Sequence, residues 1–141
     1  MMENFGENKI KRIMVDMSAT LLHHGHIRLL KNAKQYGYLI VALTRDEEIK
    51  NKKGYFPELN FKERKEILLA IKYVDEVVPS KWLLDNEFLD IHNIDLLVHG
   101  EDNSNPISKS RLLLLPRTIG VSSTDIRKRA CSILGGSFND K

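Results

Sequence analysis

Two histidines flank a glycine in the stretch His23-His24-Gly25-His26, where an apolar run gives way to a helical pattern. Residues three apart at the start of a helix share one face, so we expect His23 and His26 to point the same way. The N-terminus of a helix attracts anions through its N–H groups and its dipole. Two imidazoles there can donate hydrogen bonds to phosphate oxygens, and Gly25 leaves room for a ligand to approach the backbone. The spacing therefore predicts a site that handles a triphosphate.

Two other interpretations of these histidines have to be weighed. They could belong to a zinc site, or they could be ordinary surface side chains. Zinc needs further ligands at familiar spacing, but Cys131 is the single cysteine, and His92 and His99 lie far along the chain. We therefore predict no metal site built from protein side chains, and we expect His24 to be a bystander.

A second cluster lies at residues 117–124, which read Arg-Thr-Ile-Gly-Val-Ser-Ser-Thr and precede a helical pattern. Such a turn offers a polyphosphate backbone N–H groups, hydroxyl donors and a fixed cation. The alternative is that the serines only cap the helix, as serines commonly do. Capping explains one serine, but it leaves an arginine, a glycine and three hydroxyls unexplained. The cluster therefore favours a phosphate-binding turn.

A third candidate is the lysine-rich segment 44–60, the longest one without clear periodicity. It contains Lys50, Lys52 and Lys53, and Arg64 follows on the next helix. Long loops in compact domains are usually functional or disordered, and a lysine on a mobile loop can close over a triphosphate. The alternatives are a solvated run of charges and an Arg64 that simply pairs with a neighbouring acid.

Alternating strand and helix patterns must position these candidates. The expected strands are Ile10 to Val15, 39–43, 77–78, 96–98 and 112–115. The expected helices are 24–36, 61–73, 82–92 and one from Ser122 or Ser123 to Leu134. This alternation predicts an α/β fold, with a five-stranded parallel sheet and helices on both faces. Ligands bind at the carboxyl ends of strands in such sheets. Four polar segments should therefore meet there: 17–26, 44–53, 99–102 and 117–124.

The composition is that of an ordinary globular protein. The 141 residues predict one domain, 1–141, with a core of about 10–134 and polar, frayed residues 1–9. Hydrophobic residues make up 42% and the net charge is +3, without the concentrated basic stripe of a nucleic-acid binder. No apolar run reaches membrane-spanning length. The charge balance and the short apolar runs therefore predict neither nucleic acid nor a membrane as a partner. The lone cysteine fits a reducing cytoplasm, where we expect the protein.

Together these residues resemble the cytidylyltransferase branch of the HxGH nucleotidyltransferase superfamily, above all the glycerol-3-phosphate cytidylyltransferase family. Cytidylyltransferase domains of phosphonate and surface-polysaccharide pathways are similar too. The resemblance spans about residues 10–134 and rests on HHGH at 23–26 and RTIGVSST at 117–124. FKERKEILLAIKYVDEVVP at 61–79 and HNIDLLVHGED at 92–102 also match. Within this resemblance, the motif RTIGVSST at 117–124 favours cytidylyl over adenylyl transfer.

The resemblance implies a Rossmann-like nucleotidyltransferase fold and a CTP-dependent reaction. The phosphate of a small acceptor would attack the α-phosphorus of CTP, and pyrophosphate would leave. Glycerol 3-phosphate is the favoured acceptor. The alternatives are a phosphonate or another polyol phosphate, adenylyl transfer, and a degenerate nucleotide-binding protein. Mg²⁺ bridging the triphosphate is the expected cofactor. The resemblance also implies a homodimer that supplies activated groups for surface polymers.

Site roles follow from the same resemblance, residue by residue. His23 and His26 would stabilise the pentacoordinate α-phosphorus, and Lys53 would close over the triphosphate. Arg117 would hold the β- and γ-phosphates. The residues implied to contact CTP are Met17, Ser18, Ala19, Gly25, Arg64, Gly100, Glu101, Thr118, Gly120, Ser122, Ser123 and Thr124.

The sequence departs from the family at two places. The family usually has Gly-Thr-Phe-Asp before the first motif, and its phosphonate-associated relatives have Met-Ser-Ala-Asp. Here residues 17–20 read Met-Ser-Ala-Thr, so Thr20 stands where the family has a carboxylate. In the family, a tryptophan often follows a Gly-Asp-Asp turn after the fourth strand. Here the turn reads Gly100-Glu101-Asp102, and Asn103 follows it. We therefore expect an acceptor pocket that differs from that of the glycerol phosphate enzymes.

Overall fold

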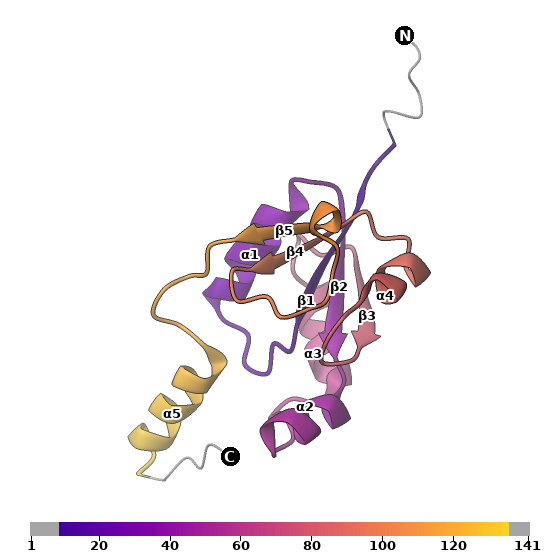
Figure 1. Cartoon of the computed structure of the whole chain (residues 1–141). Helices are drawn as coiled ribbons and strands as arrows, with labels where there is room; N and C mark the ends of the chain where they lie inside the picture. The colour runs from indigo at the N-terminus through magenta and orange to yellow at the C-terminus, as the bar shows by residue number, and fades with distance from the viewer. Residues whose placement is uncertain (1–8, 136–141) are drawn as a thin grey trace.

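Five parallel strands form one sheet in the order β3-β2-β1-β4-β5 (Figure 1). The computed structural model describes residues 9–135, so the predictions for residues 1–8 and for the tail from Gly136 lie outside the described residues. The strands are β1 (Arg12–Met17), β2 (Tyr38–Thr44), β3 (Glu76–Ser80), β4 (Leu96–Gly100) and β5 (Leu112–Leu115). The predicted five-stranded parallel sheet is confirmed.

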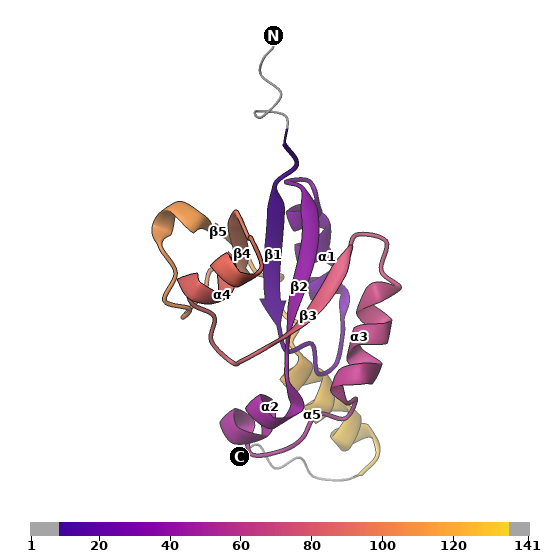
Figure 2. The same ribbon diagram turned by 90° about the vertical axis from the view of Figure 1, so that its right-hand side faces the viewer.

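The helices are α1 (His24–Lys34), α2 (Asp46–Lys53), α3 (Phe61–Leu69), α4 (Asn86–Ile91) and α5 (Ser123–Ile133), with a short 3-10 turn, η2 (Lys109–Arg111). Figure 2 shows α1 and α3 on one face of the sheet and α4 on the other. Helices therefore cover both faces, as predicted. None of the helices within residues 9–135 is long and apolar enough to cross a membrane.

Two apolar layers hold the sheet between these helices, because successive strand residues point to opposite faces. In β1, Ile13 and Val15 pack on the side of α1 and α3, whereas Met14 packs on the side of α4. All three side chains are fully buried. The chain leaves β1 toward β2 and β3, and then crosses to β4. The strand order therefore switches at the boundary between β1 and β4, and the crevice at the carboxyl ends of these strands is where such folds bind ligands.

The segment after β2 differs from the prediction of a segment without regular structure, because it contains α2. Ile49 is the one buried residue in this eight-residue helix, which explains why no apolar periodicity shows in the sequence. Charge pattern stabilises the helix instead, since acidic residues occupy its first turn and three lysines follow in its last turn. Gly54 ends the helix in the left-handed conformation, with φ of 89°.

Several predicted boundaries were wrong by a few residues. The first strand begins at Arg12, and Ile10 is 70% exposed. The helix predicted from Trp82 begins at Asn86, because the Asp85 side chain caps it by accepting a hydrogen bond from Phe88 N at 2.9 Å. The helix predicted over 61–73 is α3, which ends at Leu69, and Ile67 on this helix is 40% exposed.

Candidate active site

A cavity of about 440 Å³ opens at the carboxyl ends of the strands, close to the switch between β1 and β4. Each of the four polar segments predicted to meet there contributes lining residues: 17–26, 44–53, 99–102 and 117–124. Segments up to about a hundred residues apart in the chain thus form one site, and this is the geometry that the alternating strand and helix pattern predicted.

The two histidines of the first motif begin α1 and contact each other. His23 is the N-cap residue, and its Nδ1 accepts a hydrogen bond from Gly25 N at 3.1 Å. His26 Nδ1 accepts one from His23 N at 3.1 Å, so the pair forms a capping box with imidazoles in the usual acceptor positions. Because both Nδ1 atoms accept, each neutral ring carries its proton on Nε2. The ring centroids lie 4.0 Å apart, and both rings line the cavity.

Both imidazoles are neutral near pH 7. Burial, aided by the neighbouring His24 and Arg117 charges, lowers the pKa of His23. Burial lowers the pKa of His26 to about 4. Electrostatic repulsion from His23 and from Arg117 lowers it in the same direction. The two rings can therefore donate hydrogen bonds through Nε2–H without first taking up a proton, which suits donors aimed at phosphate oxygens.

Packing explains why a glycine occupies position 25, and the sequence alone did not reveal this. A Cβ at this position would lie 2.9 Å from His23 Cε1 and 3.3 Å from Val121 Cγ1. The glycine thus lets the His23 ring fold back over the start of α1 and lets the second motif pack against the first. We expected Gly25 to admit a ligand to the backbone, and it also lines the cavity.

The second motif lies against the first. Ser122 caps α5, since its Oγ accepts a hydrogen bond from Asp125 N at 3.0 Å. Ser123 Oγ donates to Leu21 O at 2.9 Å and accepts from Leu21 N at 3.3 Å. Capping therefore explains one serine, as expected, and the other joins the two motifs across the mouth of the cavity.

Arg117 is the fixed cation of the second motif. Its side chain is 55% exposed, and its Nη1 donates to Asp102 Oδ2 at 3.1 Å. Both residues line the cavity, so an incoming phosphate meets a guanidinium that already has a carboxylate partner. Such a pair at a half-exposed position contributes little stability, which leaves Arg117 available to exchange Asp102 for a phosphate.

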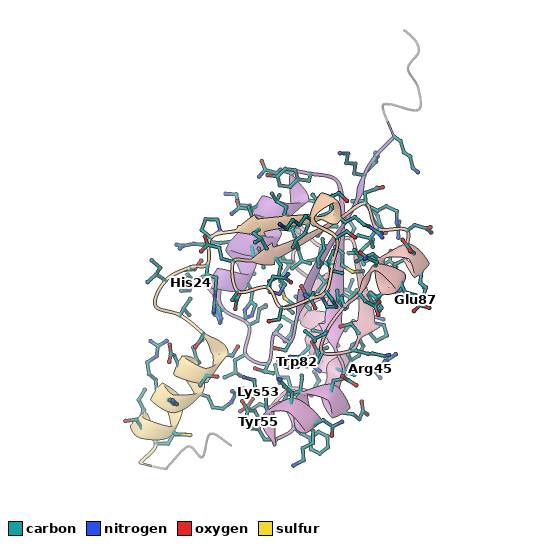
Figure 3. All side chains as sticks on the ribbon, viewed as in Figure 1. His24, Arg45, Lys53, Tyr55, Trp82 and Glu87 are labelled. Carbon is teal, nitrogen blue, oxygen red and sulfur yellow. The ribbon has the colours of Figure 1, made fainter. Side chains whose placement is uncertain are left out.

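One lysine of the predicted lysine-rich segment lines the cavity. Lys53, the last residue of α2, places Nζ 5.9 Å from the ring centroid of Trp82. Lys50 instead donates to Gly54 O at 2.9 Å. Figure 3 shows Lys53 and Trp82 near Tyr55 beside α2. Trp82 is held there because its backbone N–H donates to Glu48 Oε1 at 3.0 Å.

Arg64 lies outside the cavity lining. The family resemblance implied instead that Arg64 contacts CTP. Its side chain is 1% exposed. Its guanidinium donates to Asp46 Oδ1 and to Ser18 O, each at 2.6 Å, and to Leu59 O at 3.0 Å. The alternative, pairing with a neighbouring acid, describes this geometry. In this structure Arg64 fixes the turn after β1 to the start of α2 and the residues before α3.

The remaining predicted residues fall into two groups. Those that line the cavity are Ser18, Gly100, Thr118, Ser122, Ser123 and Thr124. Those outside the lining are Met17, Ala19, Glu101 and Gly120. Met17 and Ala19 belong to the apolar layer beneath the turn, and a Cβ added at Gly120 would meet no atom within 4 Å. The buried pair can therefore shape the turn from below without contacting a ligand through side chains.

Sequence reasoning missed an acid and a histidine at the floor of the cavity. Asp16 ends the apolar run of β1, and its Oδ2 accepts from Asn105 Nδ2 at 3.0 Å. His99 Nε2 lies 3.3 Å from Asp16 Oδ1. Burial disfavours the charged His99 ring, but hydrogen bonding and attraction to Asp16 outweigh burial and raise its pKa. A carboxylate directly after the apolar run Ile13 to Val15 was the signal that could have identified this pair.

It also missed Tyr55, Trp82 and Arg127, which line the cavity together with Lys53 and the 117–124 turn. Arg127 lies within a run of three basic residues on α5, and nothing in the sequence distinguishes it from its neighbours. Within residues 9–135, no group of three His, Cys, Asp or Glu side chains could hold a metal ion.

The chain is similar in sequence to known proteins. A sequence profile of the family described as cytidylyltransferase-like matches residues 20–129. The chain is 39% identical to the glycerol-3-phosphate cytidylyltransferase of Bacillus subtilis (strain 168) over 132 residues, which cover 88% of this chain and all of that protein. It is 38% identical to the ethanolamine-phosphate cytidylyltransferase of Mus musculus over 133 residues, 86% of this chain and 33% of that longer protein.

A solved structure shares the fold. The lipopolysaccharide core biosynthesis protein from Thermoplasma volcanium GSS1 aligns with a TM-score of 0.61 over 93% of each chain, at 20% sequence identity. At this identity the likeness concerns the arrangement of strands and helices alone.

Proposed function

The chain belongs to the cytidylyltransferase-like family, and we propose that it transfers CMP from CTP to the phosphate of glycerol 3-phosphate. It is a cytidylyltransferase that acts on a phosphorylated small molecule. The proposal concerns the acceptor, the nucleotide contacts and the roles of individual residues. The observation that supports it most is the meeting of two neutral imidazoles and the 117–124 turn in one cavity.

In the proposed reaction, a phosphate oxygen of the acceptor attacks the α-phosphorus of CTP in line. A new bond forms between that oxygen and the α-phosphorus, and the bond from the α-phosphorus to the bridging oxygen of the β-phosphate breaks. Pyrophosphate leaves with the electron pair. The attacking phosphate is already ionised at pH 7, so the site needs positioning and charge stabilisation rather than a strong base.

His23 and His26 supply the charge stabilisation in this proposal. Their Nε2–H donors would contact the oxygens on which negative charge grows in the pentacoordinate transition state. The donors are oriented in advance, because each Nδ1 is held by a backbone N–H at the start of α1. The N-terminus of α1 adds its dipole at the same place.

Cations hold the leaving pyrophosphate in this proposal. Arg117 would exchange its contact with Asp102 for the β- and γ-phosphates, and Lys53 would move from Trp82 toward them. The hydroxyls of Thr118 and Thr124 lie in the same lining and can donate to phosphate oxygens. The 117–124 turn thus offers the charge and the donors that a triphosphate requires.

A divalent cation fits this site when it arrives with the nucleotide. Mg²⁺ retains several waters and is commonly bound through one or two carboxylates and phosphate oxygens. Asp16 and Asp102 are the carboxylates in the cavity lining, and no group of three ligands exists within residues 9–135. A Mg²⁺ held mainly by the triphosphate would neutralise charge on the leaving group.

The acceptor is the part of the proposal that most needs a direct test. Pyrophosphate release from CTP should be measured with glycerol 3-phosphate, phosphoethanolamine, phosphocholine and 2-aminoethylphosphonate at matched concentrations. We expect the highest kcat/KM with glycerol 3-phosphate. A higher value with phosphoethanolamine would indicate an ethanolamine-phosphate cytidylyltransferase, the activity named for the mouse relative. A higher value with 2-aminoethylphosphonate would indicate a phosphonate cytidylyltransferase.

The nucleotide is tested separately by isothermal titration with CTP and ATP. We expect CTP to bind more tightly, and tighter binding of ATP would exclude the cytidylyl assignment. As part of the same proposal, we expect a homodimer that acts in the cytoplasm and supplies activated groups for surface polymers. Light scattering on the purified protein checks the oligomeric state.

A further inference from the structure

A buried arginine that the proposed mechanism does not use lies at the edge of the cavity. Arg127, on α5, is 6% exposed. Its Nη2 donates to Glu58 Oε1 at 2.6 Å, and its Nε donates to Glu58 Oε2. This two-point contact between a guanidinium and a carboxylate is the geometry of strong, oriented ion pairs. Hydrogen bonding from Arg127 lowers the pKa of Glu58, so the carboxylate is ionised at neutral pH.

Arg127 joins three segments that are far apart in the sequence. Its Nη1 donates to Tyr55 Oη at 3.1 Å, and its Cζ lies 5.1 Å from the Tyr55 ring centroid. Its Nη2 also donates to Thr20 Oγ1 at 3.1 Å. The guanidinium thus connects α5, the 54–60 segment and the turn after β1.

Each of these three segments contains or directly adjoins a residue proposed to contact CTP. The 54–60 segment follows Lys53 directly, and α5 begins at the 117–124 turn. The turn after β1 leads into His23 and His26. Arg127, Tyr55 and Thr20 themselves line the cavity beside these residues. A shift of the Arg127 side chain would therefore move Lys53 and the 117–124 turn relative to the histidines.

We propose that Arg127 and Glu58 form a positioning pair that holds Lys53 and the phosphate-binding turn in the geometry that binds CTP. Glu58, from the 54–60 segment, supplies the carboxylate for Arg127, while Thr20 supplies a hydroxyl at the turn after β1. Neither Arg127 nor Glu58 is a catalytic residue in this inference, because they act through their neighbours. The inference rests on the proposed function, since it concerns CTP affinity.

Buried pairs of this kind also stabilise folds, so the test must separate positioning from stability. The structure suggests a rescue. Thr20 Oγ1 already accepts from Arg127 Nη2, and Asp is close in size to Thr. A Thr20→Asp substitution would place a carboxylate against the same Nη2 of Arg127, where the Thr20 hydroxyl now lies. It should replace the charge removed by Glu58→Gln and keep the guanidinium in place, while the hydrogen bond from Arg127 to Tyr55 still links it to the 54–60 segment.

The experiment compares wild type, Glu58→Gln, Thr20→Asp and the double variant. Trp82 is the single tryptophan and lines the cavity, so its fluorescence reports CTP binding directly. We expect Glu58→Gln to weaken CTP binding at least about 10-fold, as for a misplaced binding group, and to change the KM for the acceptor less. We expect the double variant to regain part of the lost CTP affinity, because Arg127 again has a carboxylate partner.

Asp90→Asn is the matched control. It removes a carboxylate 2.7 Å from Arg111, outside the cavity lining, and should leave CTP affinity unchanged. The inference is overturned if Glu58→Gln lowers the melting temperature but keeps wild-type CTP affinity. It is equally overturned if Thr20→Asp fails to improve CTP binding by Glu58→Gln. If wild type itself did not bind CTP, the proposed function would fail first, and the two failures are thus distinguished.

Discussion

His26 Nδ1 accepts a hydrogen bond from the backbone N–H of His23 at 3.1 Å, so the ring that is proposed to donate to the α-phosphate also caps the helix that carries it. This double use means that removing the imidazole can damage the helix start as well as the chemistry. The activity and stability of any His26 variant must therefore be compared with those of a variant that keeps the helix cap.

His26→Gln provides that variant, because glutamine at this helical position can accept the same backbone hydrogen bond. We expect both His26→Ala and His26→Gln to lower kcat about 100-fold or more, the usual loss for a charge-stabilising donor. The melting temperature should fall further for His26→Ala than for His26→Gln. Full turnover by His26→Gln would remove the imidazole from the mechanism.

The low pKa of His26, about 4, predicts how stability depends on pH. The unfolded chain takes up a proton on this residue near pH 6.5, whereas the folded chain does so near pH 4. Folded protein therefore loses stability as the pH falls between these values. We expect the melting temperature to fall less between pH 7 and pH 4.5 in His26→Gln than in wild type. An equal fall in both proteins would show that His26 does not carry this pH dependence.

Gly25→Ala tests the contact between the two motifs. The added Cβ would lie 2.9 Å from His23 Cε1 and 3.3 Å from Val121 Cγ1, so the His23 ring must move. We expect a loss of about 1–3 kcal/mol in stability from overpacking, together with a loss of about 10-fold or more in kcat/KM from the displaced ring. His24→Ala, at an exposed neighbour outside the lining, is the control and should retain activity. Wild-type kinetics in Gly25→Ala would show that the His23 position is not critical.

Arg64→Met tests the role that the structure gives this residue. Its guanidinium pairs with Asp46 and Ser18 O while the side chain is 1% exposed. Removal leaves buried acceptors without their donor, so we expect urea denaturation to show a loss of about 3 kcal/mol or more. Arg111→Met removes a less buried ion pair and should cost less. If Arg64→Met kept its stability and lost only CTP affinity, the phosphate-binding role implied by the family resemblance would return.

The fold could be predicted from the sequence because strands and most helices carry apolar patterns. The predicted strand at 39–43 corresponds closely to β2. The helix predicted from residue 61 begins there as α3, where Asn60 and Glu63 form a capping box. The helix α2 was not predicted, because a single buried residue, Ile49, produces no apolar periodicity in the sequence. Its stability comes from charge placement, which is a weaker signal than apolar spacing.

The site could be predicted as a set of segments but not as a set of contacts. His23, His26, Lys53 and Arg117 all line the cavity, because the carboxyl ends of parallel strands bring their segments together. Which arginine is buried depends on partners that only the three-dimensional structure reveals. Arg64 and Arg127 pair with Asp46 and Glu58, which are 18 and 69 residues away in the chain.

The most direct test of the central claim is a product analysis of wild-type protein with CTP, Mg²⁺ and glycerol 3-phosphate. Pyrophosphate should be quantified together with the nucleotide product by mass spectrometry. We predict one CDP-glycerol for each pyrophosphate, and a much slower reaction when ATP replaces CTP. Binding of CTP without pyrophosphate release, for glycerol 3-phosphate and every other acceptor in the panel, would contradict the account.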